Sequence, residues 1–188
     1  MCIRDSDYIK EAIRLSASSY GFQPYKIFVV ENPELRKQLQ PDSWGQSQIV
    51  DASHLFVFAN NIKFTDTMVD EYIDLKSTTQ NIPKEQLSGY ADFMKGKMAE
   101  KSEAEMTEWT AKQAYLALGN ALTAAAELGV DTCPMEGLTP SVYDKLLDLN
   151  SRNLTTAFVM TIGYRSEEDM TANQPKVRKN INELFEVI

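Results

Sequence analysis

The chain has 188 residues, 43% of them hydrophobic and 24% charged, which is the composition of a globular protein with a core and excludes a disordered chain. Its 27 acidic residues outnumber 19 basic ones, so the net charge is −8 at pH 7. An acidic surface repels phosphate backbones and anionic lipid, and no apolar run approaches the roughly 20 residues of a membrane span. We therefore expect neither nucleic acid nor a membrane as a partner.

The first six residues, Met1–Ser6, read MCIRDS and lack the apolar stretch of a secretory signal. Two interpretations stay open: a non-native start on a chain whose own N-terminus is missing, and an ordinary short start. We expect one domain over residues 7–188. Its first helix is predicted over Asp7–Ala17, where apolar residues recur at helical spacing.

Three continuous runs of β-branched and aromatic residues predict buried strands at Tyr25–Glu31, His54–Ala59 and Thr155–Tyr164. A short helix is expected after Asn32-Pro33, and a loop over Pro41–Gln48. Few strands, long helices and no internal repeat predict a single α+β domain. The remaining elements expected are helices over Thr65–Ser77, Lys84–Ala99, Glu103–Leu128 and Thr139–Leu149, a turn over Asp131–Leu138, one helical turn over Ser166–Met170, and an edge strand over Glu183–Ile188.

The helix expected over Glu103–Leu128 carries a stripe of small side chains, which allows another backbone to approach closely. We expect this helix to pack against a second helix, with a subunit interface as the favoured place. The alternative is that alanine is present only for its helix propensity. The stripe consists of Ala114, Ala117, Ala121, Ala124 and Ala125.

The standard catalytic motifs are absent from the sequence. There is neither a GxGxxG nor a GxxxxGK[ST] motif. The single histidine, His54, begins an apolar strand, has no metal-ligand spacing around it, and is interpreted as structural, so no metal site is expected. Cys2 and Cys133 form neither a CxxC motif nor a disulfide framework, which indicates a reducing cytoplasm. If the protein is an enzyme, its reactive atoms belong to a bound cofactor.

Two segments could hold an anionic cofactor. Lys176 and Arg178 alternate around Val177, so in an extended segment both point the same way and suit a phosphate. The alternative is a solvated basic tail. The hydroxyl-rich turn Ser16–Gly21 suits a flat or phosphorylated ligand, and its alternative is a plain helix-ending turn.

Four segments in order resemble FMN-dependent nitroreductases, closest to the branch of oxygen-insensitive NAD(P)H nitroreductases and dihydropteridine reductase-like proteins. LSASSYGFQPYKIFVV is similar to the family's serine-rich turn under the flavin, and GQSQIVDASHLFVFA to its next strand. WTAKQAYLALGNALTAAAELGVDTCPMEG is similar to its long central helix and Pro-x-Glu-Gly turn, and QPKVR to its phosphate-binding Lys-x-Arg. The four segments cover nearly the whole chain from Tyr8. They lie at Leu15–Val30, Gly45–Ala59, Trp109–Gly137 and Gln174–Arg178.

The resemblance implies an α+β fold with a central, mainly antiparallel sheet wrapped by helices, in an intertwined homodimer with FMN at the interface. It places flavin N5 at a backbone N–H of the Glu136–Gly137 turn and the phosphate on Lys176 and Arg178. Phe93 and Met94 fall in the variable wall that selects substrates. No side chain is assigned a catalytic role. The cofactor-binding residues implied are Ala17, Ser18, Ser19, Gly45, Gln46, Gln48, Pro134, Met135, Glu136, Gly137, Lys176 and Arg178.

The activity implied is that of an oxidoreductase that passes hydride from NADH or NADPH to FMN. The hydride then goes to a planar, electron-poor acceptor (a nitroaromatic, quinone or pterin) in a ping-pong cycle. Two departures from the family bear on this. Residues 1–6, interpreted as a possible non-native start, are not counted as the family's N-terminal Arg-x-Ser segment, although Arg4-Asp5-Ser6 has that pattern. The family's Asn and Lys at the flavin pyrimidine edge are Gly45 and Gln48 here, which predicts a lowered flavin potential. These departures favour the alternative of a flavin-binding or sequestering homologue without robust turnover. A cofactor-free helical dimer is a third interpretation.

Overall fold

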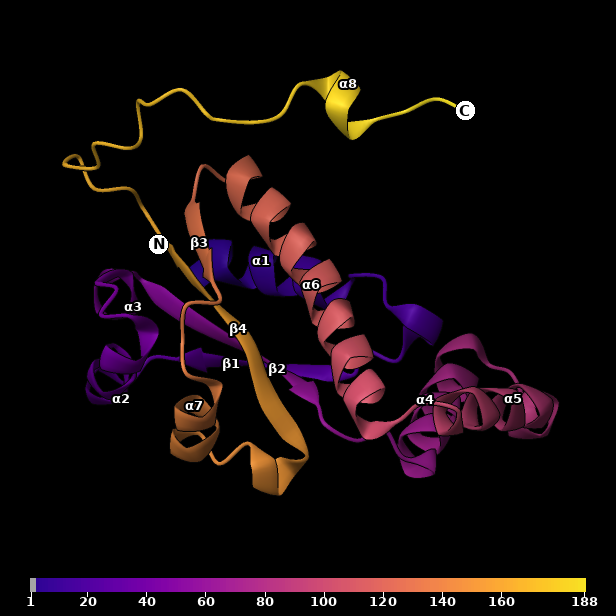
Figure 1. The fold of residues 1–188 in the computed structure, drawn as a ribbon. Coiled ribbons are helices and arrows are strands. Elements are labelled where there is room, and N and C mark those ends of the chain that lie inside the picture. Colours follow the sequence, from indigo (N-terminus) through magenta and orange to yellow (C-terminus); the bar gives the residue numbers. More distant parts are fainter. Residues whose placement is uncertain (1–2) are drawn as a thin grey trace.

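The computed structural model describes residues 3–188, with side chains from Asp5 onward, so Met1 and Cys2 lie outside the described residues. Its centre is one four-stranded sheet with the strand order β1-β2-β4-β3, in which every neighbouring pair is antiparallel. The α+β class and antiparallel sheet predicted from the sequence are confirmed (Figure 1). The strands are β1 (Tyr25–Val30), β2 (His54–Asn61), β3 (Asp131–Met135) and β4 (Leu154–Gly163).

Helices cover both faces of this sheet. On one face, α1 (Ile3–Arg14) and α6 (Glu103–Glu127) pack on Phe56, Phe58 and Phe158. On the other face, α2, α3 and α7 pack on Leu55, Val57 and Val159. Successive side chains of a strand point to opposite faces, so a strand covered on both sides has apolar residues in succession, as in residues 55–59 of β2. The bounds of these three helices are α2 (Pro33–Leu39), α3 (Gln48–Asp51) and α7 (Pro140–Leu146).

Two further helices form a pair beyond one end of the sheet, and the chain ends in a tail that runs away from the body (Figure 1). The pair is α4 (Asp66–Gln80) and α5 (Ser88–Ala99), with Val69, Ile73 and Met94 in its own small core. The tail follows β4 and contains one short helix, α8 (Ile181–Leu184). Short 3₁₀ turns complete the chain at Ser19–Gly21, Pro41–Ser43, Lys84–Leu87 and Asn150–Arg152.

The longest helix, α6, begins and ends where its capping residues place it. The Ser102 hydroxyl accepts from the Glu105 amide, and the Glu105 carboxylate accepts from the Ser102 amide, which satisfies two orphan donors of the first turn. Gly129 follows the last turn with φ +67°, the left-handed conformation that favours glycine.

The alanine stripe of α6 packs as a helix contact, but inside one chain. Ala114, Ala117, Ala121 and Ala125 are fully buried against α1 and the sheet. The prediction of close helix packing is therefore confirmed. The preference for a subunit interface at this stripe is wrong, because Ile9 and Ile13 of α1 already cover it.

Four segments differ from their predictions, and one of them is Ser166–Met170, which forms turns and not the expected helical turn. The turn expected over Asp131–Leu138 begins with β3, whose Pro134 is tolerated because β3 is an edge strand paired only with β4. The first helix starts at Ile3, and Ser6 is buried in it. The last residues form no edge strand, because the tail lies along none of the four strands of the described sheet.

The packing of the alanine stripe predicts a difference between two alanine-to-leucine changes on the same helix. Ala121→Leu inserts three carbons into a filled core and should lower the free energy of unfolding by about 1–3 kcal/mol. Ala126→Leu adds the same carbons at an exposed position of α6 and should change it by less than about 0.5 kcal/mol. Urea denaturation of both variants measures the difference, and equal effects would contradict the assignment of Ala121 to the core.

Candidate functional site

The chain turns sharply where β3 leaves the sheet. Met135 is the last residue of β3 and pairs with Val159 of β4. The next carbonyl, that of Glu136, accepts a hydrogen bond from the Leu138 amide at 2.8 Å. The amides of Glu136 and Gly137 donate to no acceptor among residues 3–188. Two adjacent backbone donors are thus available to an electron-rich ligand atom, without a side chain that can lose a proton.

The loop that connects α2 to α3 (residues 40–47) lies against this turn. The Thr139 amide donates to the Asp42 carbonyl at 2.8 Å, and the Gln46 side-chain amide donates to the Gly137 carbonyl at 3.3 Å. A hydrogen bond anchors this loop to α7, where the buried hydroxyls of Ser43 and Tyr143 lie 2.6 Å apart. The structure therefore brings Gln46 and its neighbour Gly45 to the Glu136–Gly137 turn.

Trp44 explains why glycine occupies position 137. A Cβ atom on Gly137 would lie 2.7 Å from Cε3 of the Trp44 indole, closer than van der Waals contact allows. Trp44 itself has φ +54° and is 82% exposed, so its ring lies on the turn with its outer face open. Trp44 falls in the loop predicted over Pro41–Gln48, where the sequence indicates no role for it. A tryptophan before a glycine in a polar loop is the available signal, but its contact with Gly137 is long-range.

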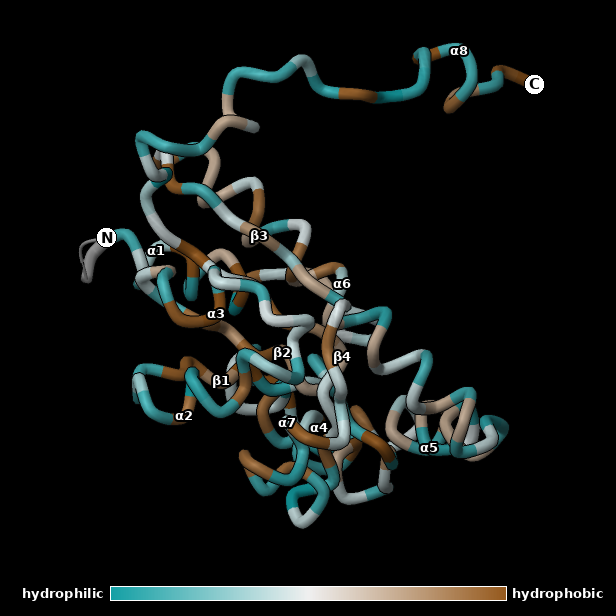
Figure 2. The backbone as a smooth tube through the Cα atoms, turned by 60° about the vertical axis from the view of Figure 1, so that its left-hand side comes forward, coloured by the Kyte–Doolittle hydropathy of each residue, from teal (hydrophilic) through white to brown (hydrophobic). Residues whose placement is uncertain are grey.

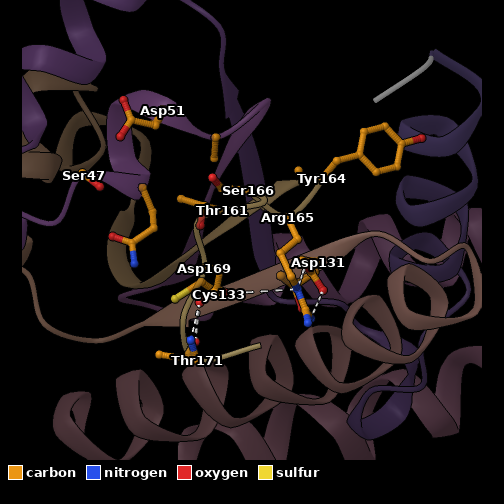
Figure 3. Close-up of a pocket in the computed structure, with 14 residues that line it drawn as sticks. Ser47, Asp51, Asp131, Cys133, Thr161, Tyr164, Arg165, Ser166, Asp169 and Thr171 are labelled. Atoms are coloured by element: carbon orange, nitrogen blue, oxygen red, sulfur yellow. Dashed lines mark hydrogen bonds and ion pairs between the residues drawn. The ribbon is translucent and has the colours of Figure 1, made fainter. Parts of the chain in front are cut away.

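An open groove of about 720 Å³ lies at the beginning of β3 and the end of β4, and no residue of the Glu136–Gly137 turn lines it (Figure 3). Gln48 and Asp51 of α3 form one wall, and Cys133 of β3 lies between them and Arg165. The guanidinium of Arg165 donates to both carboxylate oxygens of Asp131, at 2.6 and 2.8 Å. This hydrogen bonding lowers the pKa of Asp131, and burial raises the pKa of the Cys133 thiol, which stays protonated at neutral pH.

The two predicted phosphate ligands, Lys176 and Arg178, have different surroundings in the structure. Lys176 borders a second hollow next to Asp131 and Arg165. Arg178, two residues further along the tail, donates to the carbonyl of its neighbour Val177 at 2.7 Å. A further cation, not predicted from the sequence, is Arg165, which lines the groove two residues after the end of β4.

The serine-rich segment Ser16–Gly21 lies against α6, away from the groove. The Ser19 amide donates to the side chain of Gln113 on α6 at 2.8 Å, and the Ser18 hydroxyl accepts from the Gln23 amide at 2.9 Å. Ala17 is exposed beside them. Within one chain, Ala17, Ser18 and Ser19 line neither the Glu136–Gly137 turn nor the groove at Gln48.

The two residues expected in a substrate wall separate in the structure. Phe93 on α5 is 52% exposed and available to a ligand. Met94 is fully buried among Val69, Ile73 and Leu87, so it supports α5 from within the core and the expectation that it faces a substrate is corrected. Adjacent helical residues point about 100° apart, which separates the pair.

The residues of the Glu136–Gly137 turn, and of the groove that begins at Ser47 beside Gln46, fit the needs of FMN. Two unpartnered amides meet the needs of a flavin ring nitrogen, Trp44 and Met135 supply apolar area, and Gln46, Gln48 and Arg165 offer polar groups. Among residues 3–188, no cluster of three or more His, Cys, Asp or Glu side chains could hold a metal ion. None of the helices over the same residues is both long and apolar enough to cross a bilayer.

Comparison with known proteins gives one consistent family. The model of the nitroreductase family matches residues 5–164. The major NAD(P)H-flavin oxidoreductase of Aliivibrio fischeri is 32% identical over 192 residues, covering 98% of this chain and 88% of the relative. YfkO of Bacillus subtilis, which carries an NAD(P)H nitroreductase name, is 32% identical over 191 residues, covering 96% of this chain and 85% of the relative.

Solved structures show the same fold. A nitroreductase-like protein of Streptococcus mutans superposes with a TM-score of 0.82 at 20% identity, covering 97% of this chain and 85% of that chain. A nitroreductase-like protein from Exiguobacterium sibiricum, solved in complex with FMN, superposes with a TM-score of 0.83 at 18% identity, covering 100% of this chain and 88% of that chain. At these identities the likeness concerns the fold.

The contact between Trp44 and Gly137 predicts a coupled pair of substitutions. Gly137→Ala should lower the free energy of unfolding by about 1 kcal/mol, because the added methyl must displace the indole. In a Trp44→Ala background the same change should have a smaller effect, since the space is then open. Chemical denaturation of the four proteins in a double-mutant cycle measures the coupling, and strictly additive effects would contradict the contact.

Proposed function

Because this chain belongs to the nitroreductase family, we propose that it is an NAD(P)H-dependent FMN oxidoreductase that acts on planar, electron-poor acceptors. The acceptor classes proposed are nitroaromatics, quinones and pterins. The two half-reactions are proposed to follow a ping-pong order. The observation that carries the proposal is the Glu136–Gly137 turn, whose two amides have no acceptor among residues 3–188. FMN, when bound, supplies the ring that accepts and donates hydride. The chain then needs to supply position and polarity, not a nucleophile or an acid.

The residues proposed to hold FMN divide by the chemistry they offer. Pro134 and Met135 offer apolar surface next to the turn. The amides of Glu136 and Gly137 offer hydrogen bonds that persist at every pH, because a peptide N–H does not titrate in the physiological range. Gly45, Gln46 and Gln48 offer close approach and amide groups, and Lys176 and Arg178, with Arg165 beside Lys176, offer positive charge for the phosphate.

A homodimer is proposed for two reasons. In one chain the serine-rich segment lies away from the Glu136–Gly137 turn, and the apolar side chains of the tail are exposed. Ala17, Ser18 and Ser19 lie away from the turn in a single chain, so a second copy is needed if they are to contact the same flavin. The tail exposes apolar side chains to solvent, and the hydropathy of these residues colours parts of its backbone brown in Figure 2. A second copy of the chain would cover them. They are Val177, which is 90% exposed, and Ile181, Leu184, Phe185, Val187 and Ile188.

The cytoplasm is the proposed location, since the free thiol of Cys133 and the use of NAD(P)H both suit a reducing compartment. Nucleic acid is not proposed as a partner, because the net charge of −8 opposes it.

A flavin-binding protein without robust turnover is the second candidate. It is favoured by the wall of the groove at α3, where Gln48 is neutral and Asp51 is acidic. Without a cation at this wall, electrons added to a bound flavin would receive less electrostatic stabilisation from the chain.

The visible spectrum of the purified protein tests the proposal. After FMN is added and free flavin removed, a yellow protein whose absorbance bleaches with NADPH and returns with a nitroaromatic is the proposed enzyme. A yellow protein that does not bleach with NADH or NADPH supports the second candidate. A protein that retains no FMN contradicts both.

The substitution Gln48→Lys tests how a positive charge at the α3 wall of the groove changes the flavin midpoint potential. A lysine at this position should make the flavin midpoint potential more positive than in the unchanged protein, because a nearby cation favours the addition of electrons. Lys63→Gln, which alters an exposed ion pair with Glu103 elsewhere, is the control for a general change in net charge. Redox titration of the three proteins measures the shift, and a wild-type potential as high as that of Gln48→Lys would refute the expectation.

A further inference from the structure

A hydrogen bond ties the Glu136–Gly137 turn to the middle of α6. The hydroxyl of Tyr115 donates to Oε1 of Glu136 at 2.5 Å, across 21 positions of the chain. The Glu136 carboxylate forms no other hydrogen bond or ion pair with residues 3–188. On the α6 side, Tyr115 is therefore the group that fixes the Glu136 side chain.

The tyrosine is well placed to act as a rigid support. The centroid of its ring lies 4.4 Å from the ring centroid of Phe158 on β4. The ring of Phe158 is stacked on that of Phe58 of β2, with the two centroids 4.6 Å apart. Both phenylalanines are buried, whereas Tyr115 is 39% exposed and carries its hydroxyl at the outer end of this aromatic column. The position of the hydroxyl is thus set by the sheet through two ring contacts.

The hydroxyl also remains a donor over the whole working range of pH. Burial, followed by the hydrogen bond to the Glu136 carboxylate, raises the pKa of Tyr115 well above its ordinary value. The phenol is consequently neutral and protonated at any pH at which the protein operates.

The turn depends on this support because its other restraints, the pairing of β3 with β4 included, act on its backbone. The Leu138 amide holds the Glu136 carbonyl, Gln46 holds the Gly137 carbonyl, and the Trp44 indole lies on Gly137. None of these contacts fixes the Glu136 side chain. Without Tyr115, the carboxylate is free to rotate, and its negative charge can approach a ligand held by the adjacent amides.

We propose that Tyr115 is a positioning residue, whose hydroxyl holds the Glu136 carboxylate on the α6 side and thereby fixes the turn that offers its amides to the cofactor. The inference rests on the proposed function, in which that cofactor is FMN. Tyr115 does not touch the reacting atoms in this role. It acts on the geometry and the charge of the turn through Glu136.

Tyr115→Phe tests the proposal, since phenylalanine keeps the ring contact with Phe158 and removes only the hydroxyl. Its matched control is Tyr8→Phe, which removes a hydroxyl that donates to the Glu127 carboxylate of α6 at 3.3 Å, remote from the turn. Glu136→Gln is the second variant, because it keeps an oxygen that can accept from Tyr115 but carries no charge.

Two readouts separate positioning from a purely structural role. In the protein without flavin, backbone NMR spectra should show the amide signals of Glu136 and Gly137 broadened or doubled in Tyr115→Phe and unchanged in Tyr8→Phe. In the flavin-loaded protein, Tyr115→Phe should lower the midpoint potential, with about a tenfold change in the two-electron equilibrium constant, or about 30 mV. Adding Glu136→Gln to Tyr115→Phe should restore most of that potential, because the freed side chain is then neutral.

The proposal is overturned if the amide signals of the turn in Tyr115→Phe coincide with those of the unchanged protein. It is also overturned if the potential of Tyr115→Phe falls by no more than that of Tyr8→Phe. Failure of the proposed function is a different result, in which the unchanged protein retains no FMN. The NMR comparison of the flavin-free proteins then decides the positioning role alone.

Discussion

The pairing of β3 with β4 is the constraint on which the candidate site depends. β3 has five residues and a single neighbour, and its pairing ends with Met135 opposite Val159. A shift of one residue would exchange the two faces of the strand and move Glu136 back into the ladder, where its amide would be used by the sheet. The present register ends the ladder one residue before Glu136, which leaves two consecutive amides without acceptors in residues 3–188.

The turn after β3 is reached from both helical layers of the sheet. From the layer of α1 and α6, Tyr115 reaches Glu136 by its hydroxyl. From the layer of α2, α3 and α7, the loop with Trp44 and Gln46 lies against Gly137. Each layer therefore restrains a different residue of the turn. Such pre-organisation suits a cofactor site, because donors held in place need not be reordered when the ligand binds.

Local signals in the sequence were sufficient for most of the fold. The continuous apolar runs of β2 and β4 identify strands covered on both faces, the run of β1 identifies a partly covered edge strand, and Ser102 and Gly129 mark the two ends of α6. β3 was missed because it is short and contains Pro134, so its strand conformation comes from pairing with β4 and not from its own residues. Local propensity cannot indicate such an element.

The site was predictable only as far as the resemblance named segments. It indicated the Glu136–Gly137 turn and the loop at Gly45–Gln48, which the structure brings together. Trp44, Tyr115 and Arg165 were missed because their roles come from partners far along the chain: Gly137, Glu136 and Asp131. Met94 and Phe93 show the same limit, since burial of one and exposure of the other depends on the direction in which α5 packs.

The central claim is that the amides after β3 are the chain's contact with an electron-rich cofactor. Hydrogen exchange measured on peptides spanning residues 135–138, with and without FMN, tests this claim most directly. The account predicts that FMN slows exchange at Glu136 and Gly137, which have no acceptor among residues 3–188 in its absence. Bound FMN that slows exchange elsewhere and leaves these two amides unchanged would contradict it.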